Sequence, residues 1–211
     1  MAGLSLCLVA LAQEESATQS AVLWQGDLQQ GGLIRARAPV GSQVQLDDQA
    51  LLIDSEGYFL FAFGRDDTAE HQLTVTFPDG QQWQKTFTPD SREYNIERVD
   101  GVPQNTVTPP PELTERIRRE ANMVAVARKR RDLRNDWASG FIWPAQGRLS
   151  GFYGSQRVLN GVPKRPHYGL DVAAPEGTPV IAPAAGVVTL AEADLFYSGG
   201  TIIIDHGHGL S

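Results

Sequence analysis

Two residues in the C-terminal part of the chain, His167 and Asp171, have side chains that could bind one metal ion together. They are four positions apart, and because side chains alternate along a strand, this even spacing places both on one face. A helix would also align them, but Pro166, Pro175 and Gly169 favour strand and loop. An imidazole and a carboxylate on one face supply two ligands of a Zn²⁺ site. The spacing alone is weak evidence, because an H-x-x-x-D pattern often occurs by chance.

A longer series of motifs surrounds this pair, from about Pro144 to Ser211. In chain order the motifs are Gly-Arg-Leu-Ser-Gly-Phe-Tyr-Gly, His-Tyr-Gly-Leu-Asp-Val-Ala-Ala-Pro, Gly-Thr-Pro-Val, Ala-Pro-Ala-Ala-Gly-Val-Val and Ile-Ile-Ile-Asp-His-Gly-His-Gly-Leu-Ser. The series resembles the lysostaphin- and LytM-like zinc endopeptidases, which cleave peptide cross-links of bacterial peptidoglycan. That resemblance implies an antiparallel β-sheet fold in which His167 and Asp171 are the first two zinc ligands.

The same resemblance implies residues that this sequence does not contain. The family's third zinc ligand is the second histidine of an H-x-H motif near the end of the domain, and a catalytic histidine precedes it. The sequence ends at Ser211, before both. We therefore expect a fragment of a longer protein, cut inside its catalytic domain and inactive by itself.

His206 and His208 form an H-x-H pair of their own, and two interpretations of it stay open. By motif order, His206 corresponds to the family's Asp-His-Gly strand end, and the glycines at 207 and 209 are typical of a hairpin turn. We therefore expect turn residues here. The alternative is an unorthodox pair of metal ligands, since residues i and i+2 on a strand can face one ion. Tyr153, Arg157 and Tyr168 are interpreted as packing or rim residues, without an assigned role.

Two other functional classes compete with a peptidase. One is a non-catalytic LytM-like module that binds or activates a cell-wall amidase, but such modules usually lose metal ligands, and His167 and Asp171 are both present. The other is a carrier domain of lipoyl or sugar-permease type, suggested by the segment 182–188. The lysine that a carrier needs after such a strand is absent, because Lys164 is the last lysine of the chain.

The N-terminal segment 1–16 resembles a secretory signal. Residues 1–12 are an apolar run that ends in Ala10-Leu11-Ala12, similar to a signal-peptidase site, although basic residues at the front are missing. The run is shorter than the roughly 20 residues that span a bilayer, so we expect no transmembrane helix in the mature chain. The alternative is an apolar strand packed on the body. A signal places the protein outside the cytoplasm, secreted or in the periplasm, where it would meet peptidoglycan.

Residues 17–98 carry several short runs of alternating apolar and polar residues, separated by turn signals such as Pro78-Asp79-Gly80. This pattern predicts a β-sandwich similar to the Ig-like modules of bacterial envelope proteins. His71, which follows Glu70 near an expected loop, is interpreted as a solvated histidine.

Residues 99–138 predict a connector: a Pro-rich linker that ends in Pro109-Pro110-Pro111, followed by a basic helix. Thr114 is the expected cap of this helix. Its apolar stripe is expected at Ile117, Ala121, Val124, Ala125 and Leu133. Eight positive charges lie between Arg116 and Arg134, which predicts a solvated face or, alternatively, contact with an anionic wall polymer or lipid head groups. Residues 139–211 are then the N-terminal part of the peptidase domain.

The amino-acid composition excludes some classes of partner and of metal site. The chain has 211 residues with 18 basic and 25 acidic side chains, a net charge of −7, which argues against nucleic acid as a partner. Its single cysteine, Cys7, excludes a disulfide framework and a multi-thiolate zinc site. The expected architecture is therefore mainly β, with an Ig-like sandwich, a helical linker and an incomplete antiparallel peptidase domain.

Overall fold

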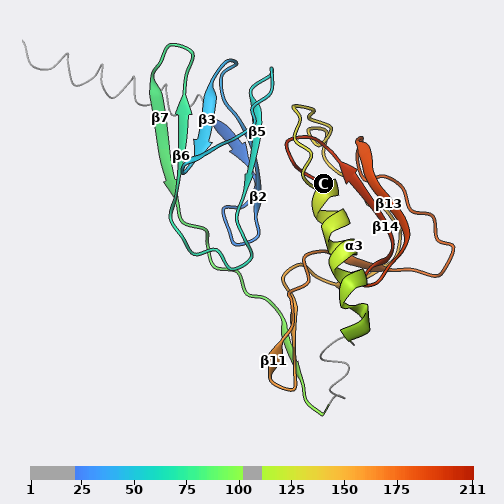
Figure 1. The fold of residues 1–211 in the computed structure, drawn as a ribbon. Coiled ribbons are helices and arrows are strands. Elements are labelled where there is room, and N and C mark those ends of the chain that lie inside the picture. The colour runs from blue at the N-terminus through green and yellow to red at the C-terminus, as the bar shows by residue number, and fades with distance from the viewer. Residues whose placement is uncertain (1–21, 102–110) are drawn as a thin grey trace, which may run out of the picture. The chain divides into compact units, whose positions relative to one another are not determined.

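The computed structural model describes residues 22–101 and 111–211. The signal-like segment 1–16 and most of the Pro-rich linker lie outside the described residues. The chain divides into two compact units between Arg92 and Glu93. Both are built mainly of strands, as the sequence predicts, and one α-helix lies in the second unit (Figure 1).

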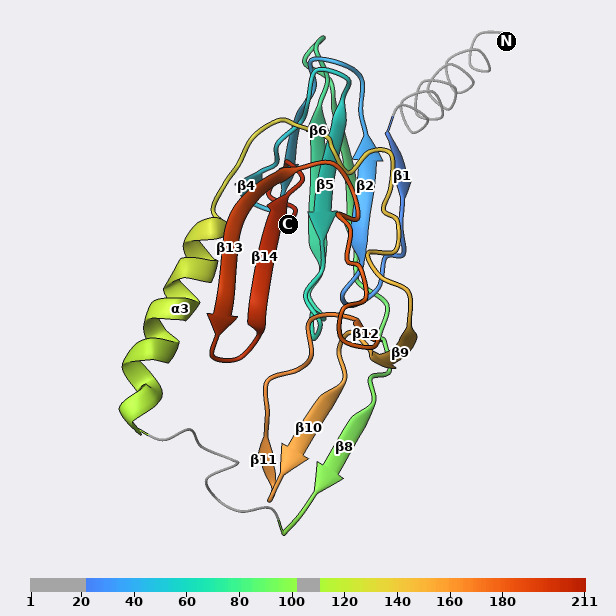
Figure 2. The ribbon, with the colours of Figure 1, turned by 90° about the vertical axis from the view of Figure 1, so that its right-hand side faces the viewer.

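From residue 22 on, the first unit consists of two antiparallel sheets (Figure 2). One has the strand order β1–β2–β5, formed by Leu23–Gln25, Leu33–Arg37 and Tyr58–Ala62. The other has the order β4–β3–β6–β7, formed by Gln49–Ala50, Gln43–Leu46, His71–Thr76 and Gln82–Phe87. Apolar residues from both sheets bury each other in one core, as expected for a sandwich.

Alternation along the strands builds this core. In β5 the rings of Phe59 and Phe61 point inward, and in β6 Leu73 and Val75 do so from the facing sheet. Because successive side chains leave a strand on opposite sides, every second residue reaches the core while its neighbours stay nearer the solvent. The alternating runs of the sequence therefore predict the two inner faces.

Turn chemistry determines how these strands are joined. Gly80 has a φ of +86° in the predicted turn between β6 and β7, where its N–H donates to the Phe77 carbonyl over 2.9 Å. Before β5, the Asp54 carboxylate accepts the N–H groups of Glu56 and Tyr58, both over 2.9 Å. An aspartate that caps its own turn in this way explains why a buried carboxylate is tolerated there.

The second unit contains three small sheets. Strand β10 (Gln156–Leu159) pairs with β11 (Val162–Pro163) and, in parallel, with β8 (Ile96–Val99). Strand β9 (Arg148–Gly151) pairs with β12 (Asp171–Ala173), and β13 (Val187–Leu195) forms a hairpin with β14 (Gly199–Asp205). The β8–β10 pair is thus a parallel addition to an otherwise antiparallel pattern.

Helix α3 (Thr114–Ala127) follows a short 3₁₀ turn, Pro111–Leu113, and lies beside β13 (Figure 2). The prediction of Thr114 as the cap is wrong, because Leu113 holds the cap position and makes no side-chain hydrogen bond. Leu133 lies beyond the helix and is exposed, so it does not extend the apolar stripe. No helix in residues 22–101 and 111–211 is long and apolar enough to cross a membrane.

Four of the eight basic residues between Arg116 and Arg134 form ion pairs within the second unit. Arg116 contacts Glu120 of the helix and Asp194 of β13, and Arg118 pairs with Glu115. Arg134 reaches the buried carboxylate of Asp205. These contacts neutralise part of the basic face within the second unit.

Candidate metal centre

The structure brings His167 and Asp171 together. Asp171 is the first residue of β12, and His167 lies in the extended loop before it rather than in the strand. His167 Nε2 is 3.2 Å from Asp171 Oδ1, with 37% and 60% of the two side chains exposed. The convergence therefore comes from a loop that enters a strand, not from two positions on one continuous strand as the spacing predicts.

Backbone contacts hold the His167 loop against the segment after β9. The His167 N–H donates to the Ser155 carbonyl over 2.8 Å, and the Gly154 N–H donates to the His167 carbonyl over 2.7 Å. Strand β9 itself pairs with β12, with Gly151 opposite Asp171 and an irregularity in register directly after it. Both candidate ligands are thus positioned by one short stretch of chain, residues 151–155.

The donor atoms of the pair fit zinc chemistry. Imidazole nitrogen and carboxylate oxygen bind zinc at about 2.0–2.1 Å, so in a tetrahedral site two such atoms lie about 3.3 Å apart. The observed 3.2 Å between Nε2 and Oδ1 agrees with that edge. Their partial exposure leaves room for an ion to approach. A third His, Cys, Asp or Glu does not join the pair within residues 22–101 and 111–211.

His206 and His208 belong to a tight turn, as motif order predicts. Gly207 and Leu210 form an isolated bridge, and His208 has a φ of +54° between Gly207 and Gly209. His208 stacks edge-on against Trp137, with ring centroids 5.4 Å apart. In the described part of the chain, neither histidine completes a three-residue metal group with His167 and Asp171.

The buried His206 is held by the backbone. Its Nδ1 lies 2.5 Å from the Ala185 carbonyl, which can only accept, so Nδ1 carries a proton. Phe141 packs edge-on against the ring with centroids 5.2 Å apart. The sequence signal for this fixed ring is the Ala-Ala-Gly run at 184–186, where a side chain at Gly186 would collide with Ile204 and His206.

The three residues left without a role have structural partners. Tyr153 packs against Tyr168 with centroids 6.0 Å apart, and the Arg165 guanidinium lies 5.3 Å from the centre of the Tyr168 ring. Arg157 Nε donates to Glu97 across the β10–β8 pair over 2.9 Å. These contacts brace the loop on either side of His167, in agreement with packing and rim roles.

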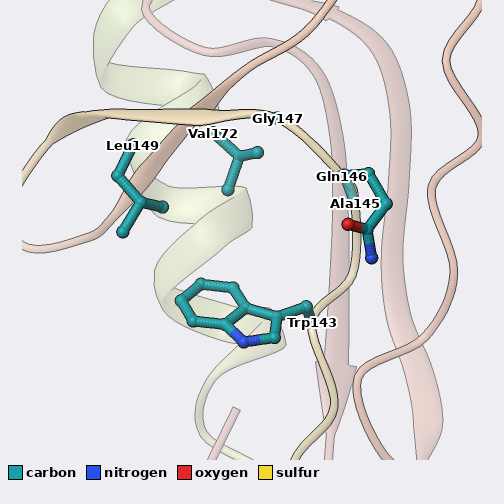
Figure 3. A pocket seen from close by; sticks show the side chains of 6 residues that line it. All are labelled: Trp143, Ala145, Gln146, Gly147, Leu149 and Val172. Carbon is teal, nitrogen blue, oxygen red and sulfur yellow. The ribbon is translucent and has the colours of Figure 1, made fainter.

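An open pocket of about 230 Å³ lies on the β9–β12 pair. Figure 3 shows Trp143, Leu149 and Val172 around it. Val172 follows Asp171 directly, and Leu149 is its partner across the sheet. Ala145, Gln146 and Gly147 complete the wall. The pocket therefore adjoins the strand that carries a candidate ligand.

A second histidine–carboxylate group lies in the first unit. His71 Nδ1 is 2.8 Å from Asp47 Oδ2, and Nε2 is 3.0 Å from Asp67 Oδ2. The side chain is 17% exposed and packs on Phe63, so the interpretation of His71 as solvated is wrong. Because its two ring nitrogens point to different carboxylates on opposite edges, the three side chains do not converge on one ion.

A comparison with models of protein families matches residues 165–211 to Peptidase family M23. The match begins two residues before His167 and includes Asp171 and the 206–209 turn. No curated protein matches the chain. The family match confirms the resemblance that the motifs of residues 144–211 indicate. Residues 165–211, with the His167–Asp171 pair at their start, are therefore similar to Peptidase family M23.

Proposed function

We propose that this chain is part of a zinc-dependent endopeptidase that cleaves peptide cross-links of bacterial peptidoglycan. The observation that carries the proposal is the His167–Asp171 pair, whose donor atoms are 3.2 Å apart inside the segment that matches the peptidase family. Both side chains are partly exposed, 37% for His167 and 60% for Asp171, rather than buried in a core. Two potential ligand side chains held at that distance, one in a loop and one at the start of β12, support a role in chemistry.

His167 and Asp171 would hold the metal through Nε2 and Oδ1. A bound zinc ion supplies Lewis acidity and lowers the pKa of a coordinated water to about 7. His167 has to present a neutral Nε2 lone pair for this role, which requires the ring proton on Nδ1. The Asp171 carboxylate supplies negative charge. A catalytic zinc site uses three protein ligands and water, so the pair alone should bind zinc only weakly.

The proposed place of action is the cell envelope, with peptidoglycan as the partner and nucleic acid excluded. The apolar segment 1–12 and its Ala10-Leu11-Ala12 ending support export. The net charge of −7 disfavours a polyanionic partner such as DNA.

The test measures release of new amino termini from purified peptidoglycan by the natural protein. We expect release to stop with a metal chelator, to return with added Zn²⁺, and to be lost in His167→Ala and Asp171→Ala. His71→Ala is the matched control, because it removes a histidine that is also paired with carboxylates.

Hydrolysis that persists in both His167→Ala and Asp171→Ala would overturn the proposal. Lysis that appears only when a cell-wall amidase is added, and that does not need His167, would favour the amidase-activating module instead.

A further inference from the structure

We propose that Gly151 is a positioning residue for Asp171, and that its missing side chain forms the seat in which the Asp171 carboxylate turns toward His167. This inference rests on the proposed zinc role of the pair. It assigns a function to a residue that binds no ligand itself.

The Asp171 carboxylate occupies the space that a side chain at Gly151 would need. A Cβ placed on Gly151 would lie 2.7 Å from Asp171 Cγ and closer still to Oδ2, whereas real Cβ atoms keep more than 3.0 Å from such neighbours. The three atoms nearest to that Cβ all belong to the Asp171 side chain. The two residues are partners across the β9–β12 pair, where the register shifts directly after Asp171. The carboxylate therefore lies folded across β9 at the one position that has no side chain.

Gly151 does not have the positive φ for which glycine is usually needed, so backbone conformation does not explain it. Gly154, three residues further along the chain, has a φ of +84°, a backbone conformation that favours glycine. Packing space for one carboxylate is the remaining physical reason for a glycine at 151. From the same stretch of chain, Ser155 and Gly154 hold the His167 backbone.

The obstructed atoms determine what a side chain at 151 would do. A carboxylate is the far end of a rotatable side chain, so Asp171 can turn away from an added methyl group by changing its rotamer. Turning away separates Oδ1 from His167 Nε2. The expected signature is a large loss of metal affinity with a small loss of stability.

The experiment compares zinc affinity by calorimetry for the unaltered chain, Gly151→Ala, Asp171→Ala and the double variant. We expect Gly151→Ala to weaken zinc binding about 10- to 100-fold, the range for residues that orient a ligand. In the Asp171→Ala background the same change should have no further effect, because the carboxylate it displaces is gone. Gly200→Ala is the control, since its Cβ would meet only the Ala193 carbonyl at 3.6 Å.

A second readout needs no metal. In the crystal structure of metal-free Gly151→Ala, the Nε2–Oδ1 separation should exceed 3.2 Å while β9 and β12 stay paired. Zinc binding by Gly151→Ala equal to that of the unaltered chain would overturn the inference. If Asp171→Ala itself leaves zinc binding unchanged, the proposed function fails, and the metal-free structure still decides whether Gly151 seats Asp171. If Gly151→Ala does not fold, recovery of the fold in the double variant supports the seat, and failure there contradicts it.

Discussion

The two units of this molecule each hold a histidine and a carboxylate four residues apart, and they use the pair differently. In the first unit Asp67 precedes His71, and a second carboxylate, Asp47, reaches the other ring nitrogen. In the second unit His167 precedes Asp171, and a single carboxylate lies near Nε2. The His71 side chain is 17% exposed, against 37% for His167. Equal spacing in sequence therefore produces a closed ion-pair cluster in one case and an accessible donor pair in the other.

The difference lies in where the lone pairs point. A metal ion needs donor atoms that converge on one point. When an imidazole lies between two carboxylates, its two nitrogens face in opposite directions. His71 joins the turn after β3, through Asp47, to the loop before β6, through Asp67, and so stabilises the sandwich. His167 Nε2 and Asp171 Oδ1 lie 3.2 Å apart, and both side chains are partly exposed. A histidine–carboxylate pair is thus evidence for a metal site only when its geometry leaves a common vertex.

The largest expected effect is on metal binding, and it separates the two histidines. His167→Ala should weaken Co²⁺ or Zn²⁺ binding at least about 100-fold, because removing a ligand costs more than disturbing the residue that orients it. His71→Ala should leave the affinity unchanged within about twofold. Absorption titration with Co²⁺ measures both. Equal losses in the two variants would contradict the distinction between a closed cluster and an open pair.

The next effect is on stability, and the roles of the two histidines reverse. Hydrogen bonds to charged groups contribute about 1.5–3 kcal/mol each, and the half-exposed Asp47 contributes less through solvent screening. We expect His71→Ala to lower the unfolding free energy of the first unit by about 2 kcal/mol, or its Tm by about 10 °C. His167→Ala should change it by less than about 0.5 kcal/mol. Hydrogen exchange of the β6 amides measures the stability of the first unit separately from that of the second. Unchanged exchange in His71→Ala would refute the stabilising role.

Much of this architecture can be predicted from local sequence. The inward-facing Phe59 and Phe61 follow from strict alternation, and the turn at Gly80 follows from Pro-Asp-Gly. The turn at His206 and His208 follows from the flanking glycines. In each case the signal and the structure lie within a few residues of each other, so propensity and periodicity suffice.

Contacts between distant segments could not be predicted in the same way. His71 meets Asp47 across 24 positions, and no local pattern marks that partnership. Arg134 pairs with Asp205 across 71 positions, so the basic stretch looks solvated in sequence although part of it is neutralised in the fold. Gly151 carries no side chain at all, and its value depends on which residue faces it across β9 and β12. Such features become visible only once register and topology are known.

The smallest effect is the pH dependence of the first unit, which tests whether His71 is charged in its cluster. Its hydrogen bond to Asp47 raises the pKa of His71 above the ordinary 6.5, although burial opposes this and the bond to Asp67 adds to it. The hydrogen bond from His71 lowers the pKa of Asp47 below 3.8. Burial acts to raise the pKa of Asp67, but the hydrogen bonds from His71 and the Ala69 N–H outweigh it and lower that pKa as well.

The signs of these shifts define a window of greatest stability. Because the pKa of His71 is raised in the folded state, the stabilisation it contributes is complete below pH 6.5 and is lost as the pH rises through the folded-state pKa. Because the pKa values of Asp47 and Asp67 are lowered, the stabilisation they contribute is present above pH 3.8 and is lost on acidification. The first unit should therefore be most stable between about pH 4 and 6.5 and weaken on both sides. Urea unfolding followed by β6 hydrogen exchange across pH 3–9 measures this. His71→Gln, which cannot ionise, should remove the alkaline decline while His167→Gln preserves it; an alkaline decline of equal size in His71→Gln would mean that another group titrates there.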